Sequence, residues 1–130
     1  MPSPNILAEF REAWLPHVTD AGLLRLTELL RQASPLLIHG MFTSAVPMGC
    51  LATQIGWHHP DTAHCQHDAG IYWLARVARL NPATSAVIVA WDQRGVHDWA
   101  LRAALLDACE AEATERAAVR EPAFAFAECC

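Results

Sequence analysis

Residues 85–91 read SAVIVAW, and their conformation decides the fold class of this chain. Residues 87–89 are three consecutive β-branched side chains, which favour a strand by propensity. The preceding Asn81-Pro82 pair favours the start of a helix instead. Because the chain offers no second convincing strand to pair with this one, we predict a helix, with one short extended segment as the alternative.

Start and stop signals divide the rest of the chain into further helices. Serine, threonine and aspartate before a periodic apolar run are typical N-caps, and proline ends such runs. The expected helices begin at Ser3-Pro4, Thr19 or Asp20, Cys50, Asp61 and Asp98, and they end by Pro16, Ser34, Trp57, Leu80 and Glu121-Pro122. The sequence therefore predicts an all-α, compact bundle of five or six helices, with one domain over residues 1–120 and a tail over 121–130.

The composition indicates a folded domain and excludes some partners. The chain has 130 residues, of which 53% are apolar, so it can bury a sizeable core. A net charge of −5 without a basic stripe argues against a general nucleic-acid binder. No run approaches the roughly 20 apolar residues of a membrane span, and no signal peptide is recognisable. Five cysteines, two of them adjacent at 129–130, predict reduced thiols and a cytoplasmic protein.

The stretch GWHHPDTAHCQHDAG, residues 56–70, is a candidate metal site. Imidazole and carboxylate groups are ligands that transition metals such as zinc prefer. The potential ligands are four histidines and one aspartate, namely His58, His59, His64, His67 and Asp68. If a helix begins at Asp61, the last three share one face. The stretch 58–68 therefore predicts a site for zinc or another transition metal, and the alternative is an exposed polar turn between two helices.

Cys50 is the second candidate site, as a catalytic nucleophile. It lies at a predicted helix N-terminus, where the helix dipole lowers the pKa of a thiol. Such a nucleophile needs a histidine that an acid orients, and His97 followed by Asp98 offers both. These three residues predict a cysteine hydrolase or transferase. The alternative interpretation is that Cys50 is a small buried hydrophobic residue.

Two fragments resemble transglutaminase-like cysteine enzymes. VHDWAL at 96–101 looks like their His-x-Trp element, and LARVARLNPA at 74–83 is similar to the segment between their cysteine and histidine. The resemblance implies the roles given above for Cys50 and His97, and in that family the aspartate follows on the next strand. In that family, however, the histidine lies on a strand, whereas the residues that follow His97 here form a helical pattern.

A second resemblance extends over roughly residues 23–112. The Gly-Cys-Leu sequence at 49–51, the apolar run VIVAWDQRG at 87–95 and a closing leucine- and alanine-rich helix are similar to a family of small bacterial and phage proteins of unknown function. That family typically has Asn-Asp after the tryptophan, where Asp92-Gln93 follow Trp91 here. The resemblance implies a small domain and no particular activity.

Two tryptophans, Trp91 and Trp99, flank the turn QRGVH at 93–97. A tryptophan at a helix end can bury its ring while its N–H donates to a carbonyl. The alternative is a shallow aromatic cleft for a small ligand or peptide, with Arg94 and His97 at its rim.

The expected partner is another protein chain. The predicted helices carry alanine and leucine on more than one face, and AFAFA at 123–127 adds two phenylalanines without an obvious place in the core. Apolar surface of this kind marks an interface, so we expect a homo-oligomer or a protein partner. Since no catalytic constellation is complete, the sequence favours a binding or interaction module over an enzyme.

Overall fold

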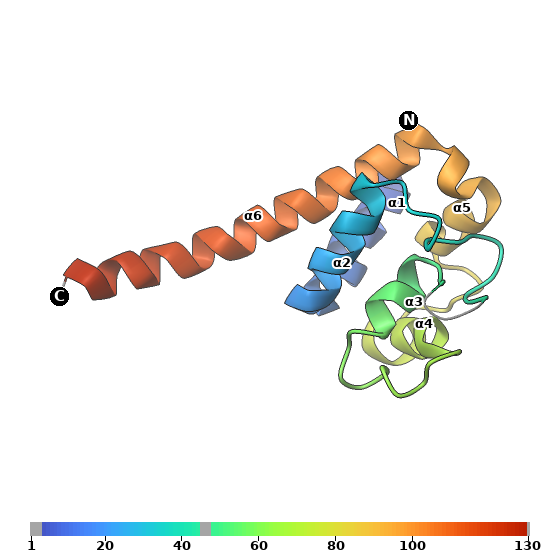
Figure 1. The fold of residues 1–130 in the computed structure, drawn as a ribbon, viewed down its shortest axis with the longest axis horizontal. Coiled ribbons are helices and arrows are strands. Elements are labelled where there is room, and N and C mark those ends of the chain that lie inside the picture. The colour runs from blue at the N-terminus through green and yellow to red at the C-terminus, as the bar shows by residue number, and fades with distance from the viewer. Residues whose placement is uncertain (1–3, 45–47, 130) are drawn as a thin grey trace.

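The computed structural model describes residues 4–44 and 48–129, and in this part of the chain it contains helices and no strand (Figure 1). The α-helices are α1 Pro4–Glu9, α2 Asp20–Arg31, α3 Leu51–Gly56, α4 Ala69–Tyr72, α5 Ala86–Arg94 and α6 Trp99–Cys129. Short π-helical turns, η1 Phe10–Trp14 and η3 Trp73–Val77, extend α1 and α4, and 3-10 turns lie at η2 Leu15–His17 and η4 Gly95–His97. The predicted all-α fold with five or six helices is confirmed.

The segment that decides the fold, residues 85–91, forms most of α5. The Ser85 hydroxyl accepts a hydrogen bond from the Ile88 N–H at 3.4 Å and caps the helix. The Glu9 carboxylate at the end of α1 accepts three more bonds, from the Ser85 hydroxyl at 2.5 Å and from the Ala86 and Val87 N–H groups at 2.9 and 3.1 Å. Free N–H groups at a helix start carry partial positive charge, so a carboxylate there stabilises the helix.

Two other predicted caps are present. The Thr19 side chain accepts from the Gly22 N–H at 3.1 Å and begins α2. The Asp98 carboxylate accepts from the Leu101 N–H at 2.9 Å and begins α6. These bonds are local, because donor and acceptor lie three residues apart, and for that reason they follow directly from the sequence.

The predicted helix start at Asp61 is wrong, since α4 begins only at Ala69 and residues 61–68 form turns. Contacts with α3 hold these turns in place. The buried Thr62 hydroxyl donates to the Gly56 carbonyl at 3.0 Å, and the Trp57 indole N–H donates to the Gln66 carbonyl at 2.5 Å. Such bonds compete with the helical pattern, so the chain closes a compact loop before α4.

Helices α3 and α4 approach each other closely because glycine lies at their contact. A Cβ atom on Gly56 would lie only 2.7 Å from the Ala69 carbonyl oxygen, and one on Gly70 would lie 2.8 Å from the Thr53 nitrogen. Neither distance leaves room for a side chain. The two ends of the histidine-rich loop are therefore fixed by direct backbone packing.

The predicted helix end at Glu121-Pro122 is also wrong, because α6 continues to Cys129. Proline removes the backbone bond to the Ala118 carbonyl. The alanine-rich sequence on both sides has high helix propensity, which accounts for the continuation. At 1.5 Å per residue α6 is roughly 46 Å long. Its second half projects well past the other helices (Figure 1). No helix in the described ranges is both long and apolar enough to cross a membrane.

Aromatic rings from the two π-helical turns meet in the centre of the core. Phe10 and Trp14 have ring centroids 5.5 Å apart, and Trp14 packs edge-on against Trp73 at 5.3 Å. All three side chains are fully buried. Rings of this size bury more apolar area than any aliphatic side chain, so this trio joins α1 to the α3–α4 pair.

Arg116 fixes α6 against the rest of the bundle. Its guanidinium donates to the Glu112 carboxylate at 2.7 Å, to the Asp20 carboxylate at 2.8 Å, and to the Leu15 and Val18 carbonyls at 2.9 and 2.8 Å. One half-buried side chain thus satisfies two backbone carbonyls and joins two carboxylates. It holds α6 against the turn between η2 and α2.

Replacing Glu9 tests the cap on α5. Glu9→Ala removes all three bonds at the start of that helix, and we expect the free energy of unfolding to fall by about 2 kcal/mol. Glu12→Ala is the matched control, because Glu12 is an exposed glutamate on the adjacent turn, and its loss should change stability by less than about 0.5 kcal/mol. Urea unfolding followed by circular dichroism measures both. Equal midpoints for the two variants would contradict the role of Glu9.

Arg116 and Arg120 give a second matched pair, since both contact Asp20 but only Arg116 also binds backbone carbonyls. Arg116→Met should lower the free energy of unfolding by about 2 kcal/mol. Arg120→Met removes an exposed ion pair and should cost less than about 0.5 kcal/mol. Urea unfolding of both variants decides the comparison, and an equal loss would show that the carbonyl contacts contribute nothing.

The same variants change the titration of Asp20. Hydrogen bonds from Arg116, and then from Arg120, hold the pKa of Asp20 below its ordinary value of 3.8. A carboxylate whose pKa is lowered on folding stabilises the fold at pH values above its ordinary pKa. This contribution is lost as the pH falls through the lowered pKa. In Arg116→Met the pKa of Asp20 should rise toward 3.8, as measured by carboxyl-carbon nuclear magnetic resonance. An unchanged pKa would refute the contact.

Candidate functional site

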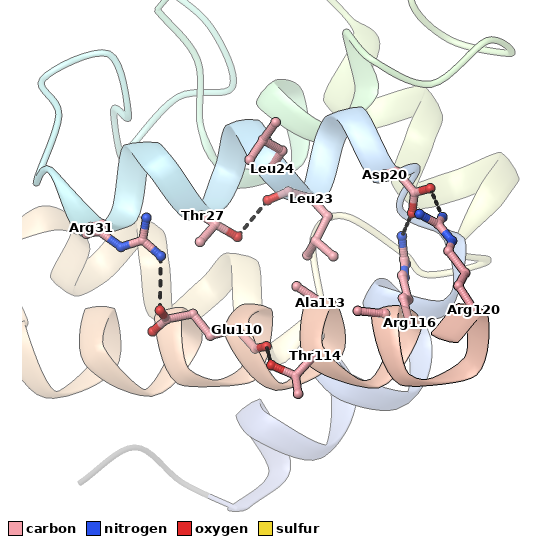
Figure 2. A pocket seen from close by; sticks show the side chains of 11 residues that line it. Asp20, Leu23, Leu24, Thr27, Arg31, Glu110, Ala113, Thr114, Arg116 and Arg120 are labelled. Atoms are coloured by element: carbon pink, nitrogen blue, oxygen red, sulfur yellow. Dashed lines mark hydrogen bonds and ion pairs between the residues drawn. The ribbon is translucent and has the colours of Figure 1, made fainter. Parts of the chain in front are cut away.

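A groove of about 410 Å³ lies between α2 and α6 (Figure 2). Its floor is apolar, with Leu23 from α2 and with Ala113 and Ala117 from α6, and Leu24 lies at its edge, on the side of α2 away from α6 (Figure 2). Leu23 is buried, whereas 62% of Leu24 is exposed to solvent. The groove therefore combines a shallow floor of small side chains with a large apolar side chain beside it.

Ion pairs between the two helices close both ends of the groove (Figure 2). At one end Arg31 of α2 pairs with Glu110 of α6 at 3.0 Å. At the other end Asp20 contacts both Arg116 and Arg120. Exposed pairs such as Arg31–Glu110 add little stability, so their effect is to give the groove polar ends and an apolar middle.

None of the residues that line this groove was predicted as a site residue. One signal is present in the sequence: Leu24 lies outside the apolar stripe of α2, in which Leu23, Leu26 and Leu30 face the core. A lone leucine on a helix surface is common, however. Only its place at the edge of a groove that α6 completes makes it notable, and that place is a tertiary property.

Cys50 lies at the N-terminus of α3 as predicted, but its environment does not activate it. Its side chain is only 1% exposed, and burial raises the pKa of the thiol. The thiol donates to the Thr53 hydroxyl at 3.6 Å. A nucleophilic cysteine needs a lowered pKa and access to substrate. This environment supports the interpretation of Cys50 as a small core residue, and its role as a nucleophile stays a prediction.

His97 and Asp98 are not arranged as a base and its orienting acid. Asp98 binds the Leu101 N–H and lies 3.5 Å from the Arg94 guanidinium. The bond from Leu101, followed by the contact with Arg94, lowers the pKa of Asp98. His97 is exposed, and its ring lies edge-on to that of His39 with centroids 5.7 Å apart. Asp98 thus acts as a helix cap.

The five predicted metal ligands do not converge. His58, His64, His67 and Asp68 are exposed, and the Nδ1 atom of His59 accepts from the Asp61 N–H at 3.1 Å. Within residues 4–44 and 48–129, no group of three or more His, Cys, Asp or Glu side chains could hold a metal ion. The predicted shared face of His64, His67 and Asp68 required a helix from Asp61, and that helix does not form.

The two tryptophans of the predicted aromatic cleft do not line a common cavity. Trp91 is fully buried, and its indole N–H donates to the Ile38 carbonyl at 2.8 Å. This is the arrangement expected for a buried tryptophan ring whose N–H finds a carbonyl. Trp99 is 67% exposed at the start of α6. Arg94 lines a separate hollow of about 330 Å³ between α1 and α5, to which neither tryptophan contributes.

The burial of the thiols predicts the order in which they react. Burial raises the pKa of Cys50, and it raises that of Cys109 to about 12, whereas Cys65 is partly exposed. With Cys129 and Cys130 replaced by serine, iodoacetamide at pH 8 should label Cys65 well before either buried thiol. Peptide mass spectrometry at successive times measures the order. Labelling of Cys50 as fast as Cys65 would instead support Cys50 as a nucleophile.

Comparisons with known proteins complete the description of the candidate sites. No family model, no curated protein and no solved structure matches this chain. The two family resemblances seen in the sequence therefore stay predictions.

Proposed function

We propose that this chain is a helical interaction module that forms a homodimer through the groove between α2 and α6. The observation that carries the proposal is the groove itself, with Leu24 exposed beside an alanine floor. In a twofold symmetric dimer the same patch lies on both sides of the interface, so it must be complementary to itself. Here each copy offers a protruding leucine and a hollow that a leucine can fill.

The charges around the groove support pairing at this face. The whole chain carries a net charge of −5, so two copies repel each other over most of their surface. The groove is lined by three arginines and two carboxylates, namely Arg31, Arg116, Arg120, Asp20 and Glu110. This patch has no excess of negative charge. It is therefore a surface that a second copy can approach at low electrostatic cost.

The position of α6 also supports an interface. Figure 1 shows its second half projecting beyond the other helices. Val119 is exposed on this part, close to the end of the groove. A second copy that covers the groove would extend the apolar contact along α6.

We propose a reducing, cytoplasmic location together with this role. Cys50, Cys65 and Cys109 are all free thiols. Free cysteines are typical of proteins in reducing compartments. The cysteine-enzyme alternative receives no support from the buried Cys50 thiol, so an interaction module is the function that the geometry favours.

Leu24→Glu tests the proposed interface. Leu24 enters the twofold interface twice, and burying one leucine contributes about 1.5–3 kcal/mol, so the dimer dissociation constant should rise roughly 100-fold or more. Met41→Glu is the matched control, because Met41 is also an exposed apolar residue but lies in the loop between α2 and α3. Its substitution should leave dimerisation unchanged.

Sedimentation velocity over a range of concentrations measures both variants against the wild type. A wild-type chain that stays monomeric at high concentration would exclude the homodimer. Equal weakening by the two substitutions would place the interface away from the groove. Circular dichroism spectra that match the wild type would show that each variant is folded.

A further inference from the structure

Arg102, in the first turns of α6, is a buried cation without a partner. Only 4% of the residue is exposed, although arginine is rarely buried unless it is paired. Its Nε, Nη1 and Nη2 atoms are shielded from solvent and make no hydrogen bond. Burial lowers the pKa of the guanidinium, but arginine keeps its charge at neutral pH. Five N–H donors and one positive charge are thus left unsatisfied.

Other arginines at the surface of this bundle show what Arg102 lacks. Arg31, Arg94, Arg116 and Arg120 each contact a carboxylate. The carboxylate four residues before Arg102 belongs to Asp98, a spacing that favours an ion pair on a helix. Asp98 instead binds the Leu101 N–H and Arg94. The one carboxylate on the same helix face is therefore already engaged.

Trp99 stacks against the Arg102 guanidinium. The guanidinium carbon lies 5.4 Å from the centre of the Trp99 ring. Because 67% of Trp99 is exposed, few contacts hold this ring in place. The ring is therefore free to change its rotamer more easily than a core side chain. An exposed indole above an unpaired guanidinium offers an apolar surface and a cation next to each other.

We propose that Trp99 and Arg102 form a binding site for a small monocarboxylate with an apolar or aromatic body. The Arg102 guanidinium binds the carboxylate through two parallel N–H···O bonds, and the Trp99 ring packs against the body of the ligand. One guanidinium balances one carboxylate. A phosphate monoester carries up to two charges at neutral pH and would need a second cation, which Arg94 does not supply because it is paired with Asp98.

Benzoate is the probe, and thermal or urea unfolding of the full chain is the measurement, with chloride at equal ionic strength as the reference. At nine times its dissociation constant, benzoate should lower the unfolding equilibrium constant of the wild type about tenfold. Acetate should act more weakly because it lacks the ring. Benzyl alcohol, which lacks the carboxylate, and inorganic phosphate should have little effect.

Two arginine variants make the test specific. Arg102→Met keeps the length of the side chain and removes the charge, so the response to benzoate should disappear. Arg76→Met is the matched control, because Arg76 also lies over an aromatic ring, that of Tyr72 at 4.9 Å, but is exposed. It should respond like the wild type. In Trp99→Ala, the ratio of the dissociation constant for acetate to that for benzoate should fall to near one.

A wild-type chain that responds to benzoate no more than to chloride would overturn the proposal. An equal benzoate response in Arg102→Met would do the same. If Arg102→Met does not fold, the Nε–H resonance of Arg102 in the wild type decides, because direct binding must shift it. A resonance that stays unmoved while the stability changes would place the benzoate elsewhere. The dimer tested through Leu24 lies on another surface, so either result stands without the other.

Discussion

The contact of Arg116 with the turn before α2 is the constraint on which the candidate interface depends. Helices α2 and α6 pack along one side, and Leu101, Leu105 and Cys109 of α6 are buried in the core. Arg116 adds a polar anchor, because its guanidinium binds the carbonyls of Leu15 at the start of η2 and of Val18 just after it. The alanines of α6 are thereby held opposite Leu23. Arg116 therefore helps to fix the position of α6 that forms the groove.

Local signals in the sequence predict most of the helix starts. Thr19 and Asp98 each bond to an N–H three residues ahead, so the information lies within one turn, whereas the cap of α5 is Ser85 and not the predicted Asn81. The choice of helix over strand for 85–91 is correct for a further reason that the sequence does not show. Glu9, 76 residues before Ser85, supplies the carboxylate that binds the first amides of α5. No propensity or spacing rule connects these two positions.

The predictions for the two candidate sites depend on tertiary surroundings that the sequence does not show. The argument for a metal site needed His64, His67 and Asp68 on one helix face, but Thr62 and Trp57 bind the backbone of their own loop and fold it into turns. The argument for Cys50 used the helix dipole correctly. Desolvation in the core exceeds the dipole effect in a helix of six residues, and the pKa rises. Burial of a single cysteine depends on every packed neighbour, so the sequence could not settle it.

Among the buried polar groups of this bundle, charge separates Arg102 from the rest. The indole N–H groups of Trp14 and Trp73 are also buried without a partner. Each is one neutral donor in a ring that gains a large apolar contact in the core, so its desolvation is offset by packing. Arg102 has a full charge and five donors, and its apolar contact is the ring of an exposed tryptophan. Packing offsets little of the free-energy cost of desolvating this charge, because a buried ion needs an opposite charge and not only close neighbours. The bundle can tolerate the two indoles as part of its core, whereas the start of α6 is stabilised whenever a carboxylate reaches Arg102.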